Sequence, residues 1–253
     1  MGFALLGSGS KGNAALFSCR DTHVLLDCGF SVQESTRRLH RLGVEPESLA
    51  AIVVTHEHSD HLGGVARVAR RYGLPVWMTR GTHAVWNDVD VPCIEHFDPH
   101  TPFAIGDLEM SPYPVPHDAR EPAQFVVGNG ATCIGVLSDA GSVTPHMCRM
   151  LQACDSLLIE FNHDSAMLAN GPYPESLKRR VGGAYGHLSN MQAADLLRRI
   201  DTSRLQHVVL THLSEKNNTP ELALTAGAEA LGCETHWLVA AEQDQGLAWR
   251  EIS

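Results

Sequence analysis

The stretch VVTHEHSDHLGG, residues 53–64, places three histidines, a glutamate and an aspartate within six positions. The apolar run LAAIVV that leads into it is typical of a buried strand, and LGGVARVARRYG after it has helical spacing. Side chains at i and i+2 of an extended segment lie on the same side, so His56 and His58 can bind one metal ion. Asp60 and His61 follow where the chain turns toward the helix, and they can face a neighbouring ion. Imidazole and carboxylate groups suit zinc, manganese or iron.

The helical zinc-protease motif HExxH does not fit this segment. His56 and Glu57 begin it, but Asp60 stands where the second histidine is required. The strand-to-loop context is also wrong for a motif that needs a helix. The segment therefore predicts a metal site at the end of a strand, with Glu57 and Ser59 outside the ligand set.

The rest of the chain alternates strands and helices. Apolar runs bounded by turn residues predict strands at 3–6, 14–19, 23–29, 49–56, 75–79, 131–141 (with a turn at Asp139), 155–164, 205–214, 235–241 and 246–252, and more strands between 81 and 130. Helical spacing predicts helices at 31–43, 62–73, 142–154, 189–200 and 219–232, with Ser189 or Asn190 and Thr219 as N-caps. This order predicts sheets with helices outside them, in one domain that spans residues 1–253.

The composition limits which cellular compartments and binding partners are compatible with this chain. The net charge of −10 argues against indiscriminate binding of nucleic acid, which needs Lys and Arg, although bound divalent metals would reverse the local field at acidic ligands. No apolar run approaches the roughly 18 residues of a membrane helix, and the N-terminus lacks the basic start of a signal peptide. Seven cysteines without a CxxC pair favour free thiols in a reducing compartment. We therefore expect a cytoplasmic protein with no membrane partner.

A glycine-rich match near the N-terminus is a false lead. Gly7, Gly9 and Gly12 spell GxGxxG, and Asp27 lies twenty residues after Gly7. A dinucleotide-binding fold needs a helix to begin at these glycines, whereas NAALFSCR predicts a strand. The loop GSGSKGN, residues 7–13, can still present backbone amides to an anion.

The segment THEHSDHLGG resembles the signature of the metallo-β-lactamase superfamily. That resemblance implies an α/β (α+β) fold, a four-layer αββα sandwich with two divalent metal ions between its sheets. It also implies later ligands at strand ends, which PVPHDA, LSDAG and LTHLS supply: His117 for the first ion, Asp139 as a bridge, and His212 for the second. The implied ligands, in chain order, are His56, His58, Asp60, His61, His117, Asp139 and His212.

Further stretches are similar to the YycJ/WalJ group of this superfamily, which are DNA 5′-exonucleases: LGSGSKGN, FNHDSAML, GPYPESLKRRV, GHLSN and LSEKNNTPELA. GHLSN is also similar to the GHL segment of tRNase Z and, more distantly, RNase J, whose histidine lies at the scissile phosphate; here it is His187. The resemblance implies hydrolysis of nucleic acid, with DNA favoured and 5′-to-3′ direction, by attack of a metal-bridging hydroxide on phosphorus. Asp60 would hold or accept the proton, and His187, with Glu160 as a candidate partner, would donate a hydrogen bond or proton.

Other polar positions are candidates for contacts to the substrate. Ser10 and Lys11 can hold a terminal phosphate, and Tyr173 and Lys178 can contact phosphates. His163 can contact the substrate or support the ligands. Each also has an ordinary interpretation as a turn, a strand end or a solvated helix face.

Other functions stay open at this point. The same metal core could serve a hydrolase of a small thioester or lactone, as in glyoxalases, or a ribonuclease of the tRNase Z/RNase J type. A non-catalytic regulatory or scaffold protein is a third class, which the complete ligand set argues against. No oligomeric state follows from the sequence.

Overall fold

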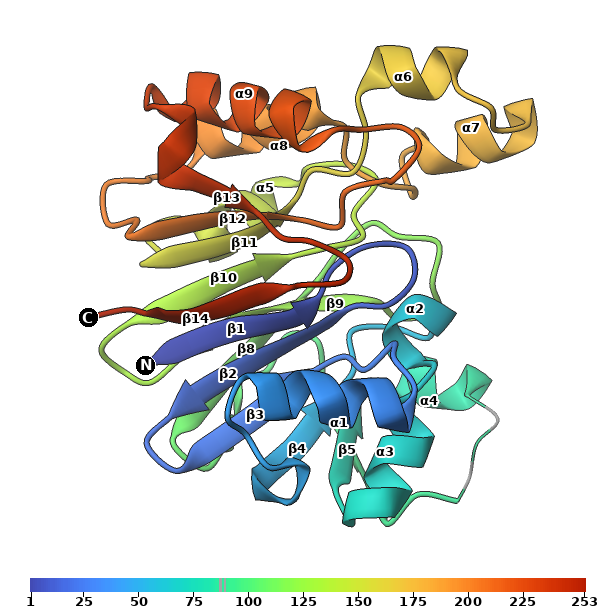
Figure 1. The fold of residues 1–253 in the computed structure, drawn as a ribbon, viewed down its shortest axis with the longest axis vertical. Helices are drawn as coiled ribbons and strands as arrows, with labels where there is room; N and C mark the ends of the chain where they lie inside the picture. Colours follow the sequence, from blue (N-terminus) through green and yellow to red (C-terminus); the bar gives the residue numbers. More distant parts are fainter. Residues whose placement is uncertain (87, 89) are drawn as a thin grey trace.

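In the part of the chain that the computed structural model describes, residues 1–86, 88 and 90–253, two seven-stranded sheets pack face to face between outer helices (Figure 1). The first sheet has the order β14-β1-β2-β3-β4-β5-β6 and the second β13-β12-β11-β10-β9-β8-β7. This arrangement confirms the predicted αββα sandwich.

Both sheets are mixed. The strands of the first sheet are β1 Gly2–Gly7, β2 Ala14–Cys19, β3 Thr22–Leu26, β4 Leu49–Val53, β5 Pro75–Met78, β6 Cys93–His96 and β14 Leu247–Glu251. Those of the second are β7 Phe103–Ile105, β8 Leu108–Pro114, β9 Ala123–Gly128, β10 Cys133–Leu137, β11 Ser156–Glu160, β12 His207–Thr211 and β13 Leu238–Ala240. In each sheet antiparallel pairing passes to parallel pairing, at β3–β4 in the first and at β10–β11 in the second. The parallel strands bring their carboxyl ends to one edge of each sheet.

Helices cover both outer faces. They are α1 Val32–Arg41, α2 Ser59–Leu62, α3 Val65–Tyr72, α4 Arg80–Val85, α5 Pro145–Leu151, α6 Ser165–Asn170, α7 Glu175–Val181, α8 Asn190–Arg199 and α9 Pro220–Leu231, with 3₁₀ turns at Pro46–Ser48 and Thr235–Trp237. Figure 1 shows α1 and α3 over the first sheet and α8 and α9 over the second, while α6 and α7 stand out beyond the strand ends. Both chain termini lie at the opposite end of the molecule.

Apolar side chains form three layers. Phe3, Phe17 and Phe125 are fully buried between the sheets, and further apolar clusters fill the spaces under the helices on either side. Strands such as β11 are buried along their whole length, which is why they appear in the sequence as continuous apolar runs. The packed sheets give the site a rigid frame.

Helix ends agree with the sequence signals where these are strong. Thr219 caps α9 by accepting a hydrogen bond from the Leu222 amide, and Gly232 ends it in the left-handed conformation with φ 64°. Of the two predicted caps of α8, Ser189 takes the role. Between residues 81 and 130 the predicted strands are present as β6 to β9, but Arg80–Val85 is helical because Thr79 caps it; Asn87 and Val89 lie outside the described residues. Among the described residues, we find no helix with the length and apolarity to cross a membrane.

Candidate metal centre

The predicted ligands converge at the edge of the sandwich where strands of both sheets end. His56 and His58 follow β4, and α2 then carries Asp60 and His61. The others follow strands of the second sheet: His117 comes after β8, Asp139 after β10 and His212 after β12. Residues separated by more than 150 positions meet here because parallel strands present their carboxyl ends at the same edge.

One donor group consists of His56, His58 and His117, which each offer a ligand atom within 4.8 Å of the others. His117 Nε2 lies 3.1 Å from His58 Nδ1, while its Nδ1 lies 3.0 Å from the Gly186 carbonyl oxygen. The Nε2 atom of His56 is buried and has no hydrogen-bond partner among the described residues. Burial also lowers the pKa of His56, which keeps the ring in the neutral form that binds metal. This orphaned nitrogen fits a metal ion.

A second donor group consists of Asp60, His61 and His212, again within 4.8 Å. His212 Nε2 lies 3.3 Å from Asp60 Oδ2. Burial opposes protonation of His212, but the charge of Asp139 and the hydrogen bonds to Asp60 and Glu160 outweigh it and raise its pKa to about 10. The structure therefore gathers negative charge where a cation would bind.

Asp139 lies between the two groups. One oxygen lies 2.9 Å from His61 Nε2, and the other lies 3.5 Å from His212 Nδ1 and 4.0 Å from His117 Nε2. Its side chain is 2% exposed, and the surrounding imidazoles hold its pKa well below the usual range against the opposing effect of burial. This position fits a carboxylate that reaches both donor groups.

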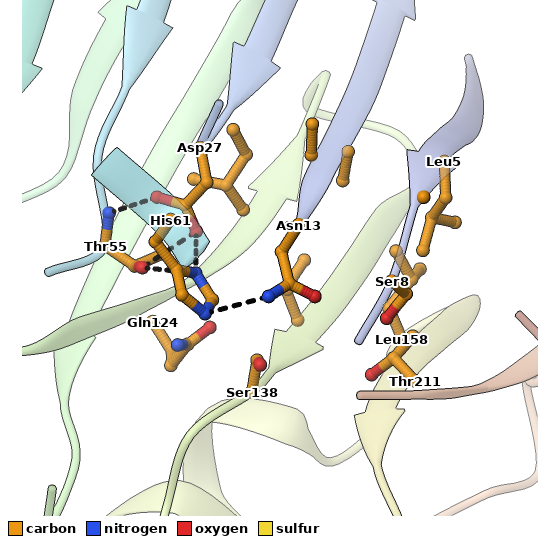
Figure 2. Close-up of a pocket in the computed structure, with 15 residues that line it drawn as sticks. Leu5, Ser8, Asn13, Asp27, Thr55, His61, Gln124, Ser138, Leu158 and Thr211 are labelled. Atoms are coloured by element: carbon orange, nitrogen blue, oxygen red, sulfur yellow. Dashed lines mark hydrogen bonds and ion pairs between the residues drawn. The ribbon is translucent and has the colours of Figure 1, made fainter. Parts of the chain in front are cut away.

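Asp27 supports the second group and was missed by the sequence analysis. Figure 2 shows it beside Thr55 and His61 at the wall of a small cavity of about 40 Å³. Its Oδ2 accepts from His61 Nδ1 at 2.7 Å and from Thr55 Oγ1 at 2.8 Å, and its Oδ1 accepts from the Thr55 amide at 2.8 Å. A carboxylate that orients the far nitrogen of a ligating histidine is a recurrent support of metal sites. The only sequence signal was the aspartate that ends the apolar strand LLD.

The N-terminal glycine loop also reaches the site. Asn13 Nδ2 lies 3.2 Å from Asp60 Oδ2 and 3.1 Å from His61 Nε2, and the Asn13 amide donates to the Asp60 carbonyl at 2.7 Å. Gly9 and Gly12, with φ of 144° and 148°, give the loop its bend. The loop that matches the dinucleotide-binding pattern therefore holds α2 in position through hydrogen bonds.

Three of these residues have strained backbones. Asp27, Asp139 and His212 adopt positive φ values of 60°, 51° and 55°. Left-handed conformations outside glycine cost on the order of 1–3 kcal/mol and cluster at functional sites. These backbones carry Asp139 and His212 in the donor groups and Asp27 in contact with His61.

His187 lies in the loop between α7 and α8, and it forms a further group with Asp139, Glu160 and His212 in which the possible ligand atoms lie within 4.8 Å of one another. Its Nδ1 lies 2.8 Å from Glu160 Oε1 and 3.3 Å from Asp139 Oδ1. Burial opposes protonation of the ring, but the charge and hydrogen bond of Glu160 outweigh it and raise the pKa of His187. Glu160 is fully buried and also accepts from the Ala140 and Leu188 amides. The pair that the sequence offered as a candidate is in direct contact.

A cleft of about 340 Å³ opens onto the centre and is lined by Asp60, Asp139, His187 and His212, with α7 as one wall. Two of the predicted substrate residues, Ser10 and Tyr173, line it as well. Arg180 lines it from α7, and its Nε donates to Asp118 Oδ2 at 2.5 Å.

The remaining predicted substrate residues lie near this cleft without lining it. Lys11 is exposed at the rim and pairs with Glu215 at 2.7 Å. His163 and Lys178 line a different hollow, on the far side of α7. Their contact with the substrate stays a prediction.

Two of the chain's three lysines lie near the cleft. Lys11 follows Ser10, which lines the cleft, and the Lys216 Nζ atom lies 5.8 Å from the centre of the Tyr173 ring. On a protein with a net charge of −10, this placement makes the rim locally favourable for an anion.

Comparisons with known proteins agree with this geometry. Residues 22–213 match the beta-lactamase superfamily domain. The chain is 33% identical to the exodeoxyribonuclease YycJ of Bacillus anthracis, over 90% of this chain and 88% of that protein. It is 34% identical to the exodeoxyribonuclease WalJ of Streptococcus pneumoniae, over 87% and 84%.

Among solved structures, the metallo-β-lactamase fold protein YhfI of Bacillus subtilis superposes with a TM-score of 0.77 at 16% identity, with 99% of each chain covered. That likeness concerns the fold alone. Together with the sequence matches, it shows that the chain belongs to the metallo-β-lactamase branch of the beta-lactamase superfamily, in the family of YycJ and WalJ.

Proposed function

We propose that the protein is a divalent-metal-dependent phosphodiesterase that hydrolyses nucleic acid, specifically a DNA 5′-to-3′ exonuclease of the cytoplasm that works as one domain. The observation that carries the proposal is the contact of His187 with Glu160, beside the donor groups and open to the cleft. The preference for DNA and for an exonuclease rests on the similarity to YycJ and WalJ.

The donor groups fit two divalent ions, for which zinc, manganese and iron have suitable ligand preferences. His56, His58 and His117 would hold one, Asp60, His61 and His212 the other, and Asp139 would contact both. Bound there, the ions supply an activated water and offset the charge on the non-bridging phosphate oxygens.

The chain's own residues supply the remaining functions. Glu160 holds the Nδ1 side of His187 at 2.8 Å, so the other ring nitrogen can donate to the phosphate or to the leaving alkoxide. Asp60 lines the cleft and can accept a proton at its carboxylate. Ser10, Tyr173 and Arg180 line the cleft and would contact the flanking phosphates.

A hydrolase of a small thioester or lactone is the main alternative from another substrate class. Arg180 in the wall of the cleft, with Lys11 and Lys216 beside it, favours an anionic substrate over a neutral one. A ribonuclease of the tRNase Z type is a second alternative, which the similarity of the GHL segment with His187 and the shared fold support.

The decisive experiment is a cleavage assay with Zn²⁺ or Mn²⁺ on 5′-phosphorylated DNA and RNA, each single- and double-stranded, with a thioester as control substrate. We expect cleavage of DNA from the 5′ end and a loss of about 10²-fold or more in kcat for His187→Ala, the scale of general-acid catalysis. His40→Ala, an exposed histidine on α1, is the matched control. Turnover of the thioester without cleavage of nucleic acid would exclude the proposal.

Metal analysis of the same variant separates two roles of His187. If the residue acts on the substrate, His187→Ala keeps the metal content of the wild type while losing activity. Loss of one equivalent of metal would instead identify His187 as a ligand.

A further inference from the structure

Helix α7 separates two hollows of different chemistry. Leu177, Arg180 and Val181 face the cleft at the metal centre. Glu175, Lys178, Arg179 and Gly182 face a second hollow of about 570 Å³, which α6 and the start of α8 enclose. Because neighbouring residues of one short helix line both, the two hollows lie on opposite sides of a cylinder about 10 Å across.

The second hollow carries two cationic side chains. The Lys178 ammonium is held in place, since it donates to the Ala169 carbonyl oxygen at 2.6 Å and lies 3.1 Å from Glu175 Oε1. Its side chain is 16% exposed, whereas that of Glu175 is 75% exposed and can move into solvent. The Arg179 guanidinium is exposed and has no ion pair or hydrogen bond within the described part of the chain.

Neutral polar groups complete the lining. Ser165 adds a hydroxyl and His163 an imidazole, while the Gln192 amide in the same lining is bonded to Ser189 and to the Gly141 carbonyl oxygen. The pKa of His163 is lowered by burial, so its ring adds no charge. The hollow therefore offers two cations, a hydroxyl and an imidazole against one mobile carboxylate, a set that suits a phosphate group.

We propose that this hollow binds a second phosphate of the nucleic-acid strand whose scissile phosphate lies at the metal centre, so that the strand crosses α7. The inference rests on the proposed function. Arg180 on the cleft side and Lys178 and Arg179 on the far side would contact phosphates on either side of the helix. The subsite would select polymers over small phosphodiesters.

The test compares substrates that reach the second hollow with one that cannot. The variants are Arg179→Gln and Lys178→Met, and Arg199→Gln, an exposed residue on α8, is the matched control. The substrates are a 5′-phosphorylated single-stranded oligonucleotide, the same strand with a 5′-hydroxyl, and bis(p-nitrophenyl) phosphate. We expect each variant to raise KM for the oligonucleotide about tenfold, the scale of one charge-assisted contact, with kcat/KM for the small diester unchanged.

Two further results decide the inference. Each variant should reduce the salt dependence of oligonucleotide binding by about one counterion, and the control should not. A smaller effect with the 5′-hydroxyl strand assigns the subsite to the terminal phosphate, and an equal effect assigns it to an internucleotide phosphate. An unchanged KM, or equal losses on the small diester, would overturn the proposal.

Binding at the subsite can also be tested independently of the proposed catalytic activity. Fluorescence anisotropy with the metal-free protein and a labelled oligonucleotide measures binding without turnover. If the wild type cuts neither substrate but Arg179→Gln weakens binding, the subsite stands and the nuclease assignment fails. Cleavage by the wild type with identical binding by the variants leaves the nuclease and removes the subsite.

Discussion

Single side chains at this centre act through contacts that only the folded chain creates. Asp27 satisfies three donors at once and fixes the orientation of His61. Glu160 contacts His187 and His212 in the same way. Burial opposes its ionisation, but the charge of His187 and the hydrogen bonds of both rings outweigh this and lower its pKa to about 2. The ligand set predicted from the sequence thus depends on supporting carboxylates that carry no motif of their own.

Asp27→Asn is expected to weaken metal binding by about 10- to 100-fold, because it removes the carboxylate that orients a ligating ring. Asparagine tolerates the left-handed backbone at this position, so the fold should survive. Competition with a chromogenic chelator measures the affinity. Asp107→Asn, at a partly exposed ion pair with Arg20, is the control. Unchanged affinity in the Asp27 variant would contradict the assigned support.

At the scale of elements, the loop from α7 to α8 is held by close backbone contacts. A β-carbon on Gly186 would lie 2.1 Å from the Arg180 carbonyl oxygen and 2.2 Å from that of Val181. The His187 amide donates to the same Val181 oxygen at 2.8 Å. The glycine is therefore required for the position of His187.

Gly186→Ala is expected to reduce the free energy of unfolding by about 2 kcal/mol or more and to lower kcat, because the backbone must shift. Gly128→Ala on β9 is the control, since its nearest contact would be an ordinary 3.5 Å. Urea unfolding and the oligonucleotide assay measure the two effects. Equal stability and equal activity of both variants would show that the loop accommodates a side chain.

A buried arginine of helix α1 forms hydrogen bonds to the backbone beside the first sheet, and an ion pair within the helix accompanies them. Arg38 is buried, donates to the Leu6 and Gln243 carbonyl oxygens, and pairs with Glu34 at 2.6 Å. The hydrogen bonds of Arg37 and Arg38 lower the pKa of Glu34 from 4.5 to about 2. Because the folded-state pKa is the lower one, the stabilisation is complete above pH 4.5 and disappears as the pH falls toward 2.

Glu34→Gln should therefore cost about 1 kcal/mol near pH 7, a value reduced by water around this partly exposed pair. The difference from the wild type should shrink between pH 4.5 and pH 2. Urea unfolding at pH 7, 5, 4 and 3 measures it, with the exposed Glu47→Gln as control. A difference that stays constant over this range would refute the ion-pair origin.

The elements that the sequence predicted are those with strong local signals. Apolar runs predicted β4, β10, β11 and β12, and the polar residues at strand ends predicted side chains that the structure gathers into groups able to hold a metal ion. Helices α6 and α7 were not predicted because six and seven residues with prolines and glycines around them carry little periodicity. Asp27 and the hollow behind α7 depend on tertiary contacts between distant segments, which no local pattern encodes.

At the scale of the whole molecule, the metal centre connects the two sheets. His56, His58, Asp60 and His61 come from the first sheet and its helix, whereas Asp139 and His212 come from the second. Without a cation, the cluster holds carboxylates against imidazoles across this junction, as in the 3.3 Å contact of Asp60 with His212. A ligand that binds only this assembled arrangement stabilises the folded state by mass action.

Removal of metal is therefore expected to lower the melting temperature of the protein. Free metal at about 100 times its Kd contributes about 2.7 kcal/mol, and for a chain of this size each kcal/mol corresponds to about 2–4 °C. Differential scanning calorimetry with Zn²⁺ or Mn²⁺, and then with excess chelator, should show a fall of roughly 5–10 °C. In His56→Ala the fall should be smaller, because this variant lacks one of the proposed ligands and binds metal more weakly. In His40→Ala the fall should equal that of the wild type. If neither metal nor chelator changes the melting temperature, the two sheets are held together by their apolar layer alone. The donor groups would then contribute nothing to the contact between the sheets.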